Sequence, residues 1–363
     1  MQSGRVLFVF QLVLVFTESH RGWNRGRRPG GHHGHGKDHD HHHKYGSKCK
    51  TSQFRGSLKI RSVNEVKKVL INDLFDARSD RYAHVVRAAF HDCVGGCDGC
   101  INRNNPGNAG PMLETLDAMD KIYDAKAKKL MSRADFYVLT AITGLEESLK
   151  FNNRNLRSNY IRPVKFKFRY GRCDCQTSPT TNVDRTFPGG EFGYDEVMDY
   201  LNEEFGLNQR EVVALMGAHT LGGASGAKGS GFQGFWKEGA TAAARLNNRY
   251  YSLLVDQSLR WKHVDQAKVT GSSTSKWQWQ AGTTSTGVPA PFMLNADVSL
   301  YKRINPDSSG KSSCQFRSCS LSPSGQLVKK YASNGDVWLK DFAKAFEKMT
   351  RKGARRLKML RYF

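Results

Sequence analysis

Two stretches decide the fold of this chain: RAAFHDC at residues 87–93 and REVVALMGAHTLGG at residues 210–223. In the first, Arg87 and His91 are four residues apart, and on a helix that spacing places both side chains on one face. The second is a strongly apolar helical pattern that ends at His219. A cation and a neutral imidazole that converge on one cavity are an unusual pair, and they suggest a reactive site.

The Arg87–His91 pair suits the heterolytic cleavage of a peroxide. His91 can take a proton from one peroxide oxygen and return it to the leaving oxygen, while Arg87 stabilises the negative charge that develops there. The alternative is an arginine and a histidine on a solvated helix face, which is the more common arrangement for such a pair taken alone.

A third stretch, FMLNADVSL at residues 292–300, places Asp297 among apolar neighbours. A buried carboxylate needs a partner. If Asp297 accepts the Nδ1 proton of His219, the imidazole gains basicity and its Nε2 becomes a strong axial ligand for iron. The alternative for His219 is a core histidine with satisfied hydrogen bonds.

With these segments in view, the sequence resembles the heme peroxidase superfamily, which includes cytochrome c peroxidases, ascorbate peroxidases, and the fungal and plant secretory peroxidases. The resemblance runs in the family's order from about residue 57 to residue 350. It implies an all-α, two-subdomain fold with heme b held between the helix that bears His91 and the helix that bears His219. Besides the three stretches above, the matching segments are NAG at 108–110, SRADF at 132–136, GRCD at 171–174, SGFQGFW at 230–236 and DFAKAFEKM at 341–349.

The resemblance also implies a role for each matching residue. Arg87 and His91 become the distal catalytic pair, and Asn108 orients His91. On the other side, His219 becomes the axial ligand of the heme iron, with Thr220 beside it among the cofactor-binding residues, and Asp297 its partner. Trp236 occupies the place of a proximal tryptophan that can be oxidised, or is simply a core residue.

Some positions depart from the family pattern. Phe90 stands where the intracellular class has tryptophan, so this half of the pocket resembles the secretory classes. Lys228 and Gly229 stand where ascorbate peroxidases carry an arginine, which puts ascorbate use in doubt. For the proximal cation site, Thr220 is in place, but the downstream segment offers Ala243, Arg245 and Asn247, so we expect no cation there.

The loop after His91 raises the question of calcium. Asp92, Gly96 and Asp98 fit the distal calcium motif of secretory peroxidases, so one Ca²⁺ ion is an open expectation. However, the loop HDCVGGCDGC is one residue shorter than the plant form, and Cys100 replaces a serine. A zinc site built from His91 and the nearby cysteines is possible by spacing alone, although the flanking motifs argue against it.

The N-terminal region indicates secretion. Arg5 precedes an apolar run from Leu7 to Phe16, which predicts a signal peptide over residues 1–19. Residues 20–56 form a flexible segment rich in His, Gly and Arg that could bind metal or serve only as a linker. Eight cysteines in a secreted chain are expected to form disulfides, with Cys93–Cys97 and Cys314–Cys319 as local bridges.

Helical periodicity dominates residues 57–350, for example at Phe136, Leu139 and Ile142, and at Trp338, Phe342 and Phe346. The Gly/Ser/Thr-rich residues 270–287 predict a surface loop or a short hairpin. Apart from the short run near the N-terminus, no stretch approaches the length of a membrane span.

The chain has 363 residues and a formal net charge of +23, and residues 351–363 form a basic C-terminal tail with six cations and no acid. This charge suggests attraction to acidic matrix polysaccharide, or serves only solubility. No nucleic-acid-binding motif accompanies it.

These observations favour a secreted heme peroxidase that reduces hydrogen peroxide and oxidises small phenolic or aromatic donors, or protein tyrosines, by one-electron steps. An enzyme that oxidises ascorbate is the first alternative. The second is a secreted matrix-binding or metal-binding protein that keeps the fold without turnover.

Overall fold

The computed structural model describes residues 57–154, 160–175, 185–225, 231–266, 276–282 and 290–360. Helices dominate these residues, with only small sheets, as the sequence predicted. The α-helices are α1 (Ile60–Val69), α2 (Arg81–Cys93), α3 (Met112–Ile122), α4 (Arg133–Asn153), α5 (Tyr194–Phe205), α6 (Gln209–Met216), α7 (Gly239–Ala243), α8 (Arg249–Val255), α10 (Asn295–Val298), α11 (Gly325–Ser333) and α12 (Gly335–Met349). Shorter helical turns are η1 (Leu70–Phe75), η2 (Pro106–Asn108), η3 (Tyr123–Ala127), η4 (Gly217–Thr220) and η6 (Gln257–Leu259).

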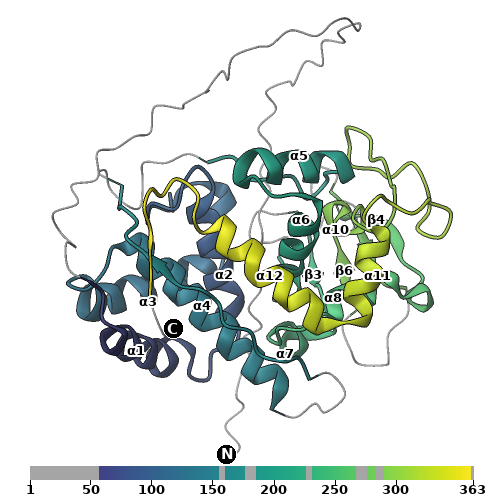
Figure 1. Cartoon of the computed structure of the whole chain (residues 1–363). Coiled ribbons are helices and arrows are strands. Elements are labelled where there is room, and N and C mark those ends of the chain that lie inside the picture. The colour runs from purple at the N-terminus through teal and green to yellow at the C-terminus, as the bar shows by residue number, and fades with distance from the viewer. Residues whose placement is uncertain are drawn as a thin grey trace, which may run out of the picture.

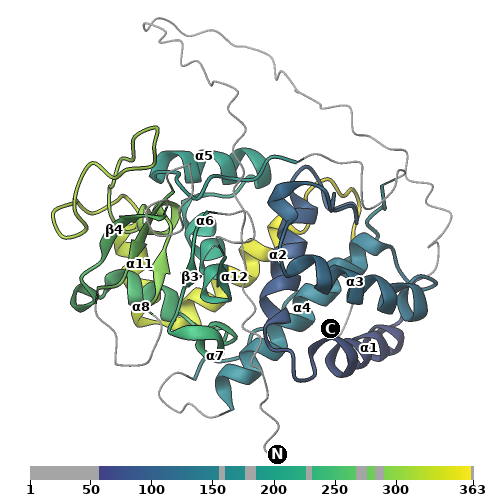
Figure 2. The same ribbon diagram turned by 180° about the vertical axis from the view of Figure 1, so that it is seen from behind.

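The helices form two lobes, which Figures 1 and 2 show from opposite sides. One lobe holds α1 to α4, with α2 packed along α4. The other holds α6, α8 and α11, with α8 packed against α11. Helix α12 runs across both lobes and packs against α6 (Figure 1). The predicted site residues therefore come from both lobes: Arg87 and His91 from α2, and His219 from η4.

Helix α4 is the central helix of the first lobe. The Oγ atom of Ser132 caps its N-terminus by accepting a hydrogen bond from the backbone N–H of Asp135. The apolar positions that predicted the helix, Phe136, Leu139 and Ile142, are all buried. Helix α4 is buried around most of its circumference, and it packs against α2, the helix that carries the distal pair.

Helix α12 is amphipathic, and Trp338, Phe342 and Phe346 form its buried stripe. The extended segment before β1 covers part of this stripe, with Phe166 making edge-to-face contacts to both phenylalanines of α12. In this segment buried Phe166 and Phe168 alternate with exposed lysines, a period of two that suits an extended chain with one buried side.

Residues 351–360 of the predicted basic tail pack against the body of the protein. Strand β7 (Lys358–Met359) pairs antiparallel with β1 (Arg169–Tyr170), and the backbone N–H of Leu360 donates to the carbonyl oxygen of Phe168 at 3.1 Å. Leu360 is buried, so apolar contact and main-chain pairing hold residues 351–360 on the body although their composition is basic. Residues 361–363, the predicted signal peptide (1–19) and the His-rich segment (20–56) lie outside the described residues.

The sheets are short. Strands β2 (Gly223–Ala224) and β3 (Gly234–Phe235) form one antiparallel pair, and β4 (Lys262–Asp265), β5 (Trp277–Gln280) and β6 (Phe292–Met293) form a three-stranded sheet with β5 in the middle. Part of the region predicted as a loop or hairpin is thus a central strand. Trp277 and Trp279 alternate with glutamines, and this period of two is what places the buried Trp279 on one side of the sheet.

Three disulfides join described cysteines: Cys93–Cys97, Cys314–Cys319 and Cys100–Cys175. The two local bridges were predicted from spacing. The third links the loop after α2 to the segment after β1 and was not predicted, because connectivity over 75 residues cannot be read from a sequence. Within the described ranges, no helix combines the length and apolarity needed to cross a bilayer.

Candidate active site

A cavity lies between α2 and the α6–η4 segment. Its walls are largely apolar and include Val86 and Phe90 from α2, Leu215 from α6 and Phe346 from α12. Arg87 and His219 also line it. A cavity with largely apolar walls and a few convergent polar groups is typical of small-molecule and cofactor sites.

The distal side of the cavity is built on α2. Arg87 and His91 are both buried, and their spacing along the helix brings Arg87 Nε to 3.3 Å from His91 Nε2. A hydrogen bond fixes the position of the guanidinium: its Nη2 donates to the carbonyl oxygen of Gly107 at 2.7 Å. Burial lowers the pKa of Arg87 to about 9, so the side chain stays charged at neutral pH.

The hydrogen bonds of His91 define its tautomer. Asn108, at the end of η2, donates through Nδ2 to the carbonyl oxygen of Asn102 at 2.7 Å, which leaves its Oδ1 as the acceptor facing His91. This Oδ1 lies 2.6 Å from His91 Nδ1, so Nδ1 carries the proton and Nε2 keeps a lone pair beside Arg87. Burial, followed by the charge of Arg87, lowers the pKa of His91 well below its usual value, so the imidazole is a neutral base.

Sequence reasoning missed Phe187, whose ring lies 3.9 Å from that of His91. Together with the Asn108 hydrogen bond, this ring restricts the rotation of the imidazole. No motif marks Phe187, because it reaches the site from a segment without regular structure.

The proximal side is built on η4, which continues α6. His219 is fully buried, and its Nδ1 lies 2.6 Å from Asp297 Oδ1. Since the carboxylate accepts, Nδ1 carries the proton and the lone pair of His219 is on Nε2. That Nε2 is buried and has no hydrogen-bond partner among the residues that the structure describes. A buried imidazole nitrogen with a free lone pair, on the wall of an apolar cavity, fits the axial ligand of a heme iron.

Asp297 accepts hydrogen bonds from several elements on the proximal side. Its Oδ1 also accepts from the hydroxyl of Tyr250 at 2.8 Å, and its Oδ2 accepts from Trp236 Nε1 and from the backbone N–H of Leu294, both at 2.8 Å. The Trp236 ring lies 4.3 Å from the His219 ring. Tyr250 was not foreseen, since a tyrosine in an apolar helix gives no sign of its partner.

Thr220 does not line the cavity. Its Oγ1 donates to the carbonyl oxygen of Asn247 at 2.6 Å, so it ties η4 to the segment before α8. Lys228 and Gly229, on which the question of ascorbate depends, lie outside the described residues.

The guanidinium of Arg185 binds to the loop that carries the candidate calcium ligands. Arg185 donates through Nη2 to Asp98 Oδ1 at 2.7 Å, and through Nη1 to the carbonyl oxygens of His91 and Asp92. Asp92 Oδ1 accepts from the backbone N–H of Cys100 at 3.0 Å, while its Oδ2 has no hydrogen-bond partner in the described part of the chain. Burial raises the pKa of Asp92 and Asp98, and the charge of Arg185 opposes that rise.

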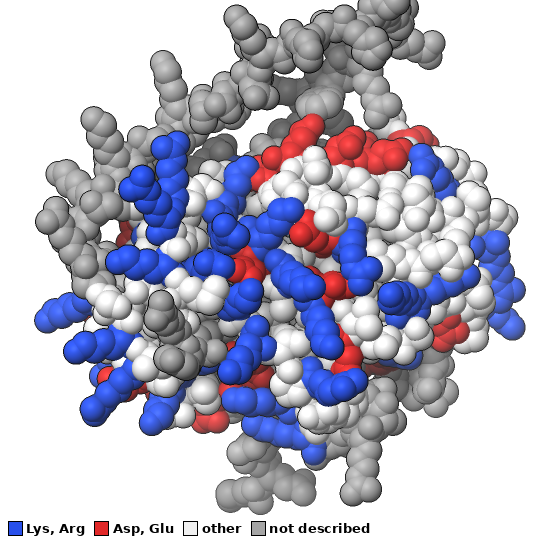
Figure 3. All heavy atoms as spheres, in the orientation of Figure 1, with Lys and Arg blue, Asp and Glu red and all other residues white. Residues whose placement is uncertain are grey.

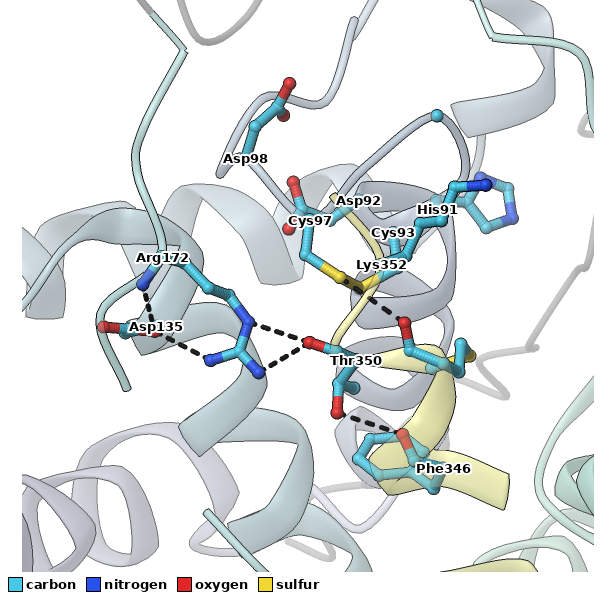
Figure 4. The surroundings of a disulfide bond; sticks show 12 residues. His91, Asp92, Cys93, Cys97, Asp98, Asp135, Arg172, Phe346, Thr350 and Lys352 are labelled. Atoms are coloured by element: carbon cyan, nitrogen blue, oxygen red, sulfur yellow. Dashed lines mark hydrogen bonds and ion pairs between the residues drawn. A yellow bond between two sulfur atoms is a disulfide. The ribbon is translucent and has the colours of Figure 1, made fainter. Parts of the chain in front are cut away.

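The same loop is closed by the Cys93–Cys97 disulfide, which Figure 4 shows next to His91, Asp92 and Asp98. Gly96 lies within this loop, and its backbone N–H donates to the carbonyl oxygen of Cys93 at 3.0 Å. The zinc alternative is wrong because Cys93 and Cys97 are bonded to each other. In the part of the chain that the structure describes, no cluster of three or more His, Cys, Asp or Glu side chains could hold a metal ion.

Comparison with known proteins agrees with this geometry. A family model described as Peroxidase matches residues 66–301. The mitochondrial cytochrome c peroxidase of Candida glabrata is 25% identical over 74% of this chain and 64% of its own length, and that of Neurospora crassa is 27% identical over 70% of this chain and 58% of its own. The mitochondrial cytochrome c peroxidase of Yarrowia lipolytica is 26% identical over 61% of this chain and 51% of its own length. The chain thus spans between half and two thirds of these relatives.

Proposed function

This chain belongs to the peroxidase family, and from that premise we propose that it is a heme peroxidase that reduces hydrogen peroxide with electrons from a small donor. The observation that carries the proposal is the pairing of a neutral, oriented His91 with the charged Arg87. Arg87 lines a cavity whose wall also includes His219, and within the described residues His219 Nε2 has no hydrogen-bond partner.

In this proposal the chain's own residues move the protons. His91 Nε2 accepts the proton of hydrogen peroxide and returns it to the leaving oxygen, which departs as water. The guanidinium of Arg87 stabilises the negative charge on that oxygen. Asp297 holds the proton of His219 Nδ1 and so makes Nε2 a stronger ligand. When bound, the heme supplies the iron that takes up the oxidising equivalents, and Trp236 is placed to give up one electron.

For the donors, we favour small phenolic or aromatic molecules or exposed protein tyrosines. Phe90 on the distal wall of the cavity stands where the intracellular class has tryptophan, and this resemblance to the secretory classes supports such donors. The relatives are named for cytochrome c, but a net charge of +23 repels any basic donor protein.

The donor proposal is tested by stopped-flow mixing of the heme-loaded protein with hydrogen peroxide, followed by guaiacol, ascorbate or reduced cytochrome c in separate mixes. We expect a fast spectral change with peroxide that guaiacol reverses and the other two reverse slowly. Faster reversal by ascorbate or by cytochrome c would replace the phenolic donor. No reaction with peroxide would leave a non-catalytic binding protein.

Replacing His91 tests its role as the proton acceptor. We expect His91→Leu to slow the reaction with hydrogen peroxide by about 10²- to 10⁴-fold, because a positioned acid–base group contributes about that much. His84→Leu is the matched control: His84 is also a buried histidine on α2, but its Nδ1 contacts the Thr115 hydroxyl at 2.8 Å. Equal rates for the two variants would remove His91 from the mechanism.

The pH dependence follows from the direction of the His91 pKa shift. Only the neutral imidazole can accept a proton, and its pKa lies well below the usual 6.5. The rate constant for the reaction with peroxide should therefore stay level as the pH falls through 6.5, and should decline only in more acidic solution. A decline centred at or above pH 6.5, with near-ultraviolet circular dichroism unchanged, would contradict the pKa shift.

We also propose that the protein is secreted, in contrast to its relatives that are named mitochondrial. Three disulfides among described cysteines support an oxidising compartment. Expression of the full chain in a eukaryotic cell should place the protein in the medium without residues 1–19, whereas retention in mitochondria would refute secretion.

A basic band on the face of α12 supports binding to acidic matrix polysaccharide. Figure 3 shows Lys and Arg side chains spread over the face on which α12 lies. The carboxylates of Asp341 and Glu347 on this helix are already paired with Arg210 and Arg169. The exposed cations of the basic band are Lys165, Lys167, Lys340, Lys344, Arg351, Arg355, Arg356 and Lys358.

Heparin chromatography tests the basic band. We expect the variant with Lys340→Glu and Lys344→Glu to leave a heparin column at a clearly lower salt concentration than the parent, because fewer sulfates are paired. The matched control changes the same charge elsewhere, with Lys121→Glu and Lys126→Glu near η3. If both double variants elute together, net charge alone accounts for the binding.

A further inference from the structure

Lys237 follows Trp236 directly, and it alone of the lysines that the structure describes is buried, with 1% of its surface exposed. Burial lowers its pKa well below the usual value, and the charges of Arg245 and Arg249 add to that effect, while Glu238 opposes it. The carboxylate of Glu238 is engaged by Arg249. Among the described residues, no ion pair includes Lys237. An ammonium group in such a place is costly unless oxygen atoms replace its water.

Protein oxygen atoms take the place of water around the Lys237 ammonium group. Lys237 Nζ donates to the carbonyl oxygen of Arg245 at 2.6 Å and contacts Asn247 Oδ1 at 3.3 Å. The same Oδ1 lies 3.3 Å from the hydroxyl oxygen of Thr220 and accepts from the backbone N–H of Arg249 at 3.1 Å. A carbonyl oxygen and an amide oxygen therefore contact the ammonium, and the Thr220 hydroxyl contacts the same amide oxygen. Carbonyl and amide oxygens are also ligands that metal cations take in proteins.

This cluster connects the segments that carry His219 and Trp236, whose rings lie 4.3 Å apart on the proximal side. Thr220 is the residue after His219, and its hydroxyl donates to the carbonyl oxygen of Asn247. Lys237 is the residue after Trp236. The ammonium and Asn247 therefore join the chain at Trp236 to the chain at His219, independently of the hydrogen bonds that both residues make to Asp297.

We propose that the ε-ammonium of Lys237 is a resident cation, which takes the place of a bound monovalent ion and positions the segment carrying His219. The oxygen cluster rests on the contacts above, and only the consequence for the heme rests on the proposed function. Lys237 is a positioning residue, because it acts on His219 through Asn247 and Thr220. The protein then needs no added cation on this side of the cavity.

The test is chemical rescue of the full-length, heme-loaded protein. Lys237→Ala removes the ammonium and leaves a space lined by the same oxygen atoms. We expect it to lower the melting temperature by roughly 5 °C and to change the absorption spectrum of the heme. Methylammonium chloride or potassium chloride should restore at least half of both changes. Tetramethylammonium chloride, at equal concentration and too large for the space, should not, and the parent protein should respond to none of the three salts.

Lys237→Met is the second variant, because it fills the volume without a charge. It should lose stability like Lys237→Ala and respond to no salt. Equal effects of methylammonium and tetramethylammonium on the alanine variant would overturn the proposal. If the alanine variant does not fold in any salt, the methionine variant provides the test. A melting temperature and a heme spectrum equal to those of the parent would then overturn the proposal. Absence of peroxidase activity in the parent would affect only the proposed function, since the rescue of the melting temperature does not depend on turnover.

Discussion

The hydrogen bond between His219 and Asp297 is the interaction on which the site depends. A carboxylate buried this deeply is stable only when donors surround it, and Asp297 has four: His219, Tyr250, Trp236 and the backbone N–H of Leu294. These donors come from η4, from α8, from the residue after β3 and from the start of α10. One negative charge therefore fixes both the tautomer of the histidine and the meeting point of the short elements around it.

The residues that could be predicted from sequence are those whose chemistry requires a particular partner or whose spacing follows a regular element. Arg87 and His91 share a helix face, and a buried Asp297 requires a donor. Phe136 and Phe342 follow a helical period, so their burial could be predicted too. Strand β5 fits the short hairpin that was one alternative for residues 270–287. Its central place between β4 and β6 was not predicted, because the alternating Trp and Gln pattern covers only four residues in a Gly- and Ser-rich stretch.

Other residues could not be predicted, since composition assigns them to the surface. Arginine and lysine are rarely buried, so nothing in the sequence sets Arg185 or Lys237 apart from the other 54 cations. Arg185 reaches carbonyl oxygens of α2 more than 90 residues away in sequence, and those contacts exist only after folding. In both places a side-chain cation lies among oxygen atoms next to a residue of the site. Such a cation is covalently attached, so it adds positive charge without the entropy cost of capturing an ion.

The spacing between the distal and the proximal histidine depends on α12, because this helix contacts both lobes. Trp338 Nε1 donates to the carbonyl oxygen of Ala214 in α6 at 3.1 Å, and Phe346 lines the cavity. At the C-terminal end of α12, Arg172 donates to the carbonyl oxygen of Thr350 and also pairs with Asp135 at the start of α4, as Figure 4 shows. The backbone N–H of Cys97 donates to the carbonyl oxygen of Lys352. Because the disulfide loop, α4 and α6 are all bonded to this one segment, the two sides of the cavity keep a fixed separation.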